Sequence, residues 1–162
     1  MKIIKGQEII EDSWTRVADE DDLPEGQVIV SLARWQQDRE SLLSRGNSGL
    51  GVALDADHHA EDIADDLEHF DVVALNFPVF RDGRAYSVAR LLRDRYDYKG
   101  EVRATGDVLR DQLFYMYRCG FDAFEVRADR SVEDALKAFD EFSVVYQPSV
   151  EEPLPLWRRR SS

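Results

Sequence analysis

The chain has 162 residues, a length typical of one domain, and 43% hydrophobic with 33% charged residues argues against wholesale disorder. With 21 basic and 33 acidic residues the formal net charge is −12, which disfavours nucleic-acid binding. No apolar run approaches a membrane span and the first residues are no signal peptide, so we expect a cytoplasmic protein without membrane contact. The one cysteine, Cys119, excludes an intramolecular disulfide and a self-sufficient cysteine-ligated iron–sulfur cluster.

In chain order, short apolar segments alternate with segments of helical spacing. Residues 2–4 and 8–10 indicate a small hairpin, and the acidic stretch 19–25 indicates a loop. Five strands then follow, each with a helix after it. The expected strands are 28–32, 51–54, 72–77, 101–105 and 123–126, and the expected helices are 34–44, 58–69, 83–96, 108–118 and 132–142.

Several helix ends have recognisable signals. Asp82 and Asp107 are placed to cap the third and fourth helices, because an aspartate side chain accepts hydrogen bonds from the first-turn amides. Gly120 follows the fourth helix, where a left-handed residue is expected. The fifth helix opens with 131–134 (SVED), which resembles a capping box.

Strands alternating with helices predict an α/β fold with a mostly parallel sheet of about five βα units and a short N-terminal hairpin. The sheet is expected to be either open and doubly wound, with helices on both faces, or a half-barrel that closes by forming a homodimer. A closed eight-fold barrel needs about 200 residues or more. We expect residues 1–147 to form a single domain and 148–162 to form a flexible tail.

Ligands of open parallel sheets bind beyond the carboxyl ends of the strands. The loops 76–87 and 103–112 each combine glycine, an expected capping aspartate and arginines, which together can bind an oxyanion or phosphate. The alternative is ordinary turn-and-cap chemistry, with the arginines paired to nearby aspartates. The predicted anion-binding residues are Arg81, Arg84, Arg103 and Gly106, and the candidates for proton transfer are Asp107, Asp111 and Tyr86.

Charge is unevenly spread along the chain. The segment 55–71 holds eight acidic residues and no Lys or Arg, whereas 81–103 holds seven bases against four acids. An acidic flank and an Arg-rich patch on one molecule attract a small anion to one side. The alternative is that both segments are solvated helix faces.

Two further features give weaker predictions. Cys119 fits either a redox or nucleophilic role or a small buried hydrophobe. His58 and His59 lie among acidic residues, a combination that can hold a divalent metal. Adjacent helical positions point about 100° apart, so the two rings do not easily converge, and we predict no metal site.

Common cofactor and catalytic motifs are missing from the sequence. None of GxGxxG, GxxxxGK[ST], CxxC, HExxH or GxSxG occurs. The residues therefore do not indicate a dinucleotide dehydrogenase, a P-loop enzyme, a thioredoxin-like enzyme or a common hydrolase. Flavin sites have no compulsory motif, so the cofactor stays unknown.

Several segments together resemble one bacterial family. The longest is 77–87 (FPVFRDGRAYS), and the others are 28–35, 89–93, 106–112, 118–124 and 139–143. They are similar to the domain of unknown function 934 family, often labelled a probable oxidoreductase of sulfite reduction. The resemblance covers nearly the whole chain from Lys2 to Gln147.

The resemblance implies an accessory role in assimilatory sulfite reduction and cysteine biosynthesis, because family members tend to be encoded beside sulfite reductase. In this role the chain is an electron-delivery or oxidoreductase partner, docked on sulfite reductase by acidic segment 55–71. The resemblance carries over no catalytic residues, and electron transfer would need a borrowed cofactor or the partner's redox centre. The alternatives are a small-molecule enzyme or oxyanion-binding domain using loops 76–87 and 103–112, and a scaffold without a ligand.

Overall fold

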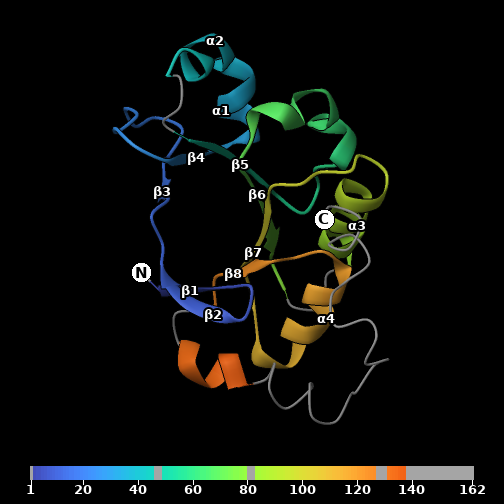
Figure 1. Cartoon of the computed structure of the whole chain (residues 1–162). Helices are drawn as coiled ribbons and strands as arrows, with labels where there is room; N and C mark the ends of the chain where they lie inside the picture. The colour runs from blue at the N-terminus through green and yellow to red at the C-terminus, as the bar shows by residue number, and fades with distance from the viewer. Residues whose placement is uncertain (1, 46–48, 80–82, 127–130, 138–162) are drawn as a thin grey trace.

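The computed structural model describes residues 2–45, 49–79, 83–126 and 131–137 (Figure 1). The strands are β1 (Lys2–Lys5), β2 (Glu8–Glu11), β3 (Thr15–Arg16), β4 (Val28–Ser31), β5 (Leu50–Leu54), β6 (Val72–Phe77), β7 (Glu101–Gly106) and β8 (Ala123–Phe124). The α-helices are α1 (Leu32–Gln37), α2 (Arg39–Leu43), α3 (Arg84–Asp94) and α4 (Leu113–Cys119), and the 3-10 helices are η2 (Ala60–Asp62), η3 (Ala64–His69) and η4 (Arg110–Gln112).

The eight strands form one sheet in the order β2-β1-β8-β7-β6-β5-β4-β3. Neighbours from β3 to β8 are parallel, whereas β1 is antiparallel to both β2 and β8. The sheet is therefore mixed, and the mostly parallel prediction holds for one part of it. The predicted hairpin is confirmed as β1 and β2, and β3 is a strand that the sequence did not predict.

The sheet curls into a half-barrel with its helices on the outer side (Figure 1). The segment between β2 and β3 crosses the open side of the curl from one edge of the sheet to the other. Of the two expected architectures the half-barrel is therefore the one observed, and its closure by a homodimer stays a prediction. The doubly wound alternative is wrong, because it needs helices on both faces and the described helices lie on one.

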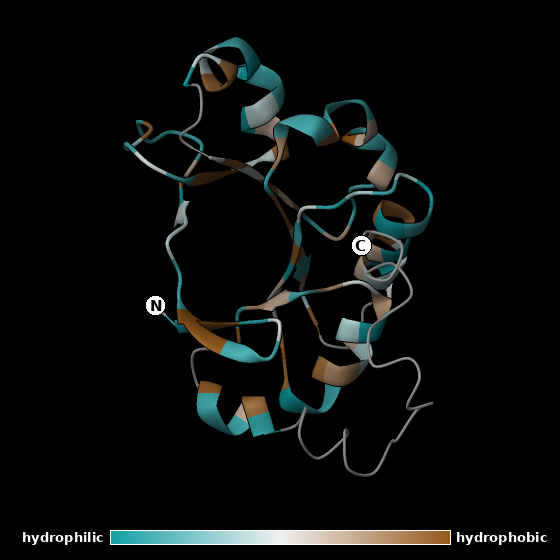
Figure 2. Cartoon of the chain, viewed as in Figure 1, coloured by the Kyte–Doolittle hydropathy of each residue, from teal (hydrophilic) through white to brown (hydrophobic). Residues whose placement is uncertain are grey.

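Alternate strand residues face opposite sides of the curl, as the pleat of a strand requires. In β6, Leu75 and Phe77 belong to the main core, which also holds the buried apolar residues of α3 and α4. Val72 and Ala74 face the inside, where Trp14 packs against them. Figure 2 shows hydrophobic colour along much of the sheet and hydrophilic colour over much of the outer helices.

The helices differ from prediction where local sequence disfavours a regular α-helix. The predicted helix 34–44 is split into α1 and α2, with Asp38 as C-cap of one and N-cap of the other. The predicted helix 58–69 forms the 3-10 helices η2 and η3 instead. In an α-helix Glu61 and Asp65 would be i,i+4 neighbours of like charge, as would Asp62 and Asp66, and such pairs are destabilising.

The predicted helix ends have mixed outcomes. Gly120 ends α4 in the left-handed conformation with φ of 119°, as predicted. The N–H of Asp134 donates to Oγ of Ser131 across 3.1 Å, and residues 132–137 are helical, which confirms that start. Asp107 does not cap a helix, because η4 and α4 begin later in the chain. Residues 138–142 of the fifth predicted helix and the predicted tail lie outside the described residues.

Candidate functional site

The two loops predicted to bind an anion lie side by side at the carboxyl ends of β6 and β7. Phe77 pairs with Gly106 at the strand ends, and the N–H of Asp107 donates to the carbonyl of Phe77 across 2.8 Å. Farther along, the hydroxyl of Tyr86 lies 3.3 Å from Oε1 of Gln112. These contacts place the start of α3 and η4 on one rim of the sheet.

Gly106 has a steric role at this rim. Its φ is +86°, and a Cβ there would lie 2.4 Å from both Oδ1 of Asn76 and the carbonyl oxygen of Phe77. Glycine alone satisfies both the left-handed backbone and the close approach. The turn that joins β7 to the next loop therefore depends on Gly106, and its anion-binding role stays a prediction.

Helix α3 begins at this rim with Arg84. Its N-cap is Gly83, which has no side chain to cap the first turn, and that turn holds no acidic residue. The amino end of an 11-residue helix favours an anion, because its amides and dipole are positive there. The side chain of Arg84 is exposed. The predicted ligand Arg81 and the predicted cap Asp82 lie outside the described residues.

The candidates for proton transfer share the rim but differ in environment. Burial raises the pKa of the Tyr86 hydroxyl to about 12, and the neighbouring Cys119 and Tyr115 add to the shift. At neutral pH Tyr86 is therefore a hydrogen-bond donor and not a base. Asp107 is half-buried and Asp111 is exposed, and proton transfer by either stays a prediction.

Arg103 does not belong to the rim. It lies within β7 with its side chain 1% exposed, inside the curl. Its Nη1 is 2.9 Å from Asp12 and 3.0 Å from Glu125, and its Nε is 2.8 Å from Glu101. This corrects the prediction that Arg103 joins Arg84 in an anion site, because three carboxylates already surround its charge.

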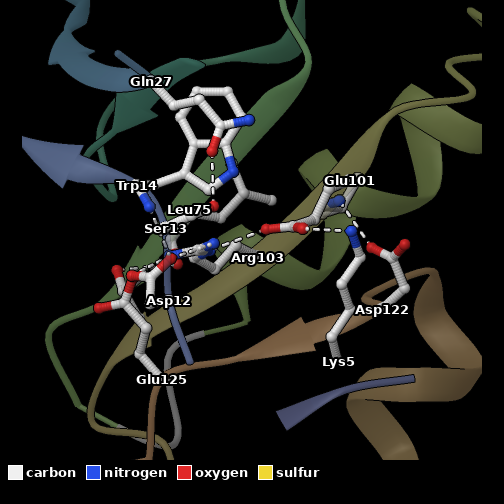
Figure 3. A network of polar contacts seen from close by, with 12 residues as sticks. Lys5, Asp12, Ser13, Trp14, Gln27, Leu75, Glu101, Arg103, Asp122 and Glu125 are labelled. Carbon is white, nitrogen blue, oxygen red and sulfur yellow. Dashed lines mark hydrogen bonds and ion pairs between the residues drawn. The ribbon is translucent and has the colours of Figure 1, made fainter. Parts of the chain in front are cut away.

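Charged side chains of alternating sign run across the inside of the curl, with Arg103 at the centre (Figure 3). Glu101 also pairs with Lys5 at 3.2 Å, and Glu125 also pairs with Arg16 at 3.2 Å. Lys5 and Arg16 are about half exposed, whereas Glu101 and Arg103 are buried. We call these side chains, together with Asp12, the inner network.

Asp12 ties the β2–β3 segment into the inner network. Its two oxygens accept from both terminal nitrogens of Arg103, at 2.9 and 3.1 Å, and Oδ1 also accepts the N–H of Trp14. The chain that crosses the open side is thereby fastened to the middle of β7. Trp14 then packs over the inner face of β6.

The charge of Arg103 is permanent. Burial acts to lower the pKa of its guanidinium, but the hydrogen bond to Asp12, the charge of Glu101 and the hydrogen bond to Glu125 outweigh burial. The net result is a pKa above the ordinary arginine value. A group that does not titrate suits a fixed cross-link and not acid–base chemistry.

The segment 81–103 does not form a single Arg-rich patch. Arg93 is 2% exposed, with its side chain donating to the carbonyls of Gly120, Tyr98 and Gly100. It thus joins the ends of α3 and α4 to the start of β7. The predicted patch is wrong, because Arg93 lies under the outer helices and Arg103 lies inside the curl.

Cys119 is buried at the end of α4. Its Sγ lies 3.4 Å from Nη2 of Arg90, and the same nitrogen is 3.2 Å from the hydroxyl of Tyr115. The thiol is buried and contacts the guanidinium of Arg90, and its burial fits the buried-hydrophobe interpretation of Cys119 better than a solvent-facing nucleophile.

Of the two histidines considered for metal binding, His58 belongs to a cluster of three ligand-type residues among the described residues, and His59 does not. One ligand atom each from Asp55, Asp57 and His58 fall within 4.8 Å of one another. Nδ1 of His58, however, accepts the N–H of Asp55 across 2.9 Å, so the proton of the neutral ring is on Nε2. Neither ring nitrogen offers a lone pair unless that turn opens, and the prediction of no metal site stays a prediction.

The acidic segment 55–71 presents its carboxylates to solvent on η2, η3 and the flanking turns. Asp66 is an exception, because it accepts from Nε1 of Trp35 at 3.0 Å and pairs with Arg39 at 2.9 Å. We define the acidic surface as the exposed members of the segment, which are Asp55, Asp57, Glu61, Asp62, Asp65, Glu68 and Asp71.

Sequence reasoning missed the inner network. Glu101 and Arg103 are two residues apart in a strand and therefore share a face, which was the available signal for a buried ion pair. Asp12 and Arg16 carry no such signal, because only the curl of the sheet brings them to the network, whereas Glu125 directly follows β8, the parallel neighbour of β7.

The described residues include no helix long and apolar enough to cross a membrane. The sequence matches the model of the family described as "Bacterial protein of unknown function (DUF934)" over residues 51–157, about two thirds of the chain. The chain belongs to this family. No curated protein and no solved structure matches the sequence at a significant level. The match includes both rim loops and the acidic surface.

Proposed function

We propose that this member of the DUF934 family is an accessory protein of assimilatory sulfite reduction, docked on sulfite reductase through the acidic surface. The resemblance to a family encoded beside sulfite reductase supports the pathway. The observation that carries the docking is the exposure of seven carboxylates within a segment that holds no Lys or Arg. Electron delivery in this role uses a redox centre that the partner holds.

The charge of the acidic surface mainly affects the rate at which this protein and its partner associate. A concentrated negative field steers a partner with a basic patch and speeds association, and dissolved salt screens the field over about 8 Å at physiological ionic strength. The net charge of −12 strengthens the same effect at long range. Binding through the acidic surface therefore weakens steeply as salt is raised.

The test compares two variants of equal charge. One replaces Asp55, Asp57, Glu61 and Asp65 with their amides. The matched control removes four exposed acidic charges elsewhere, at Glu20, Asp22, Glu25 and Asp94. Binding to purified sulfite reductase is measured by surface plasmon resonance at low and high salt.

We expect the acidic-surface variant to bind at least about tenfold more weakly at low salt, and the control to bind nearly as the wild type. Equal loss in both variants would mean that net charge alone acts. No binding of the wild-type protein at any ionic strength would refute the proposal.

The start of α3 favours a second candidate function, the binding of a small oxyanion. The observation is the amino end of a helix for which the described residues supply neither a side-chain cap nor a first-turn acid, at the rim where ligands of parallel sheets bind, with Arg84 as first residue. Isothermal titration with sulfite, sulfate and phosphate tests it, with Arg84→Gln as variant and Arg90→Gln as control. Absence of heat with all three anions would remove this candidate.

A further inference from the structure

Strand β2 forms one edge of the sheet, and among the described residues it pairs with β1 alone (Figure 1). In an antiparallel strand, backbone N–H and C=O groups point alternately to either side, so about half of those in β2 face away from β1. Such an edge is a template for a further strand.

The hairpin itself shows which side chains suit β2. Its register places Lys2 opposite Glu11 and Lys5 opposite Glu8, with two isoleucine pairs between them. Opposite charges in cross-strand positions stabilise pairing, as do pairs of β-branched residues. The sequence KIIK of β1 thus matches the sequence EIIE of β2 at every position.

A strand added at the edge of β2 that faces away from β1 would lie beside the same four side chains of EIIE. Glu8 and Ile10 are exposed, with Ile10 at 36%, while Ile9 is half-buried and packs against the main core. A strand added at this edge would meet acidic residues at both ends and isoleucines in the middle.

We propose that β2 binds an extended segment of another protein, in which two apolar residues lie between two basic residues. A second copy of this chain is a poor occupant, because antiparallel pairing of β2 with itself sets Glu8 against Glu11 at both ends. The occupant is therefore a peptide segment with the charge pattern of β1. This inference goes beyond the proposed function, because it uses neither the acidic surface nor sulfite reductase.

The probe is a fluorescein-labelled peptide of sequence SGKIIKGS, titrated with the full-length protein and followed by fluorescence anisotropy. Two control peptides accompany it, one with the sequence SGEIIEGS and one with KIIK methylated at alternate backbone nitrogens. Hydrogen exchange of the β2 amides, with and without peptide, locates the binding.

We expect the KIIK peptide to bind and to slow exchange of the β2 amides, and the EIIE peptide to bind at least about tenfold more weakly. The methylated peptide loses binding, because it lacks donors for the ladder. In the protein, Glu8→Gln weakens binding of the KIIK peptide several-fold, whereas Glu20→Gln leaves its affinity unchanged.

Three results would each overturn the inference. The first is no binding of the KIIK peptide, and the second is equal binding of the KIIK and EIIE peptides. The third is strong protection of every β2 amide in the protein alone, which would mean that the edge is already paired.

Discussion

Replacing Arg103 with Met tests whether the inner network holds the half-barrel together. Met keeps much of the volume but removes a cation that makes four hydrogen bonds, at 2.8 to 3.1 Å, to Asp12, Glu101 and Glu125. Breaking a buried ion pair from one side costs about 3–5 kcal/mol, because the remaining charge is left buried without a partner. Since domains are stable by about 5–15 kcal/mol, this loss is large.

The structure shows where that cost arises. After the substitution Glu101 keeps Lys5, whereas Asp12, only 6% exposed, keeps the N–H of Trp14 but pairs with no other cation in the described part of the chain. Most of the penalty therefore belongs to Asp12. The double variant with Asp12→Asn should recover about 1–2 kcal/mol of the loss, because a neutral amide is less costly to bury.

Urea denaturation followed by circular dichroism measures these free energies of unfolding, and the slope with denaturant checks that unfolding stays two-state. The single variant Asp12→Asn completes the double-mutant cycle. A loss below about 1 kcal/mol for Arg103→Met, or additive effects in the cycle, would refute the claim that Arg103 and Asp12 act as one cross-link. Arg95→Met, which alters an exposed arginine, is the control.

Three further predictions concern the rim and the inside of the curl. Gly106→Ala should cost about 2–3 kcal/mol in urea denaturation, because its Cβ would meet Asn76 at a positive φ; a change below about 0.5 kcal/mol, the size of a neutral surface substitution, would contradict this. Trp14→Ala should lower the free energy of unfolding by about 1–2 kcal/mol and reduce the blue-shifted part of the tryptophan emission, since a partly buried indole is lost from the face of Ala74. Unchanged stability would show that the indole does not pack there. The raised pKa of Tyr86, about 12, means that the hydroxyl stays protonated to a higher pH in the folded state than in the unfolded chain. The stability that Tyr86 contributes is therefore complete below about pH 10 and is lost as pH rises toward 12. Tyr86→Phe should therefore flatten the loss of stability over that range, and spectrophotometric titration of tyrosinate checks the pKa; titration of Tyr86 near 10 would refute it.

Local patterns were sufficient to predict the strands of the sheet other than β3. The nearly continuous apolar run of β6 gave its bounds, 72–77, without error, because a strand buried on both faces is mostly apolar. The spacing of Val88, Ala89 and Leu92 likewise predicted α3, and all three are buried. The N-terminal hairpin followed from two short apolar segments separated by Gly6.

The curl of the sheet could not be predicted from such patterns. Whether helices cover one or both faces depends on the handedness and length of each crossover together, and no single segment carries that information. The prediction for Arg103 failed for the same reason. A charged residue is usually exposed, and only the curl brings Asp12, from 91 residues away in sequence, to the guanidinium of Arg103 in the middle of β7.

The acidic segment shows the opposite case, in which exposure was predictable and conformation was not. Its charges had to face solvent because burial of unpaired carboxylates is costly. Asp66 alone turned inward, since Arg39 and the indole of Trp35 offer it partners that the sequence did not identify.

The most direct measurement of the proposed role is growth of a bacterium that encodes this protein after its gene is deleted. The account predicts slow or no growth with sulfate or sulfite as the only sulfur source, normal growth with cysteine, and recovery by the wild-type gene but not by the acidic-surface variant. Equal growth of the deletion strain on sulfate, sulfite and cysteine would contradict a role in sulfite reduction.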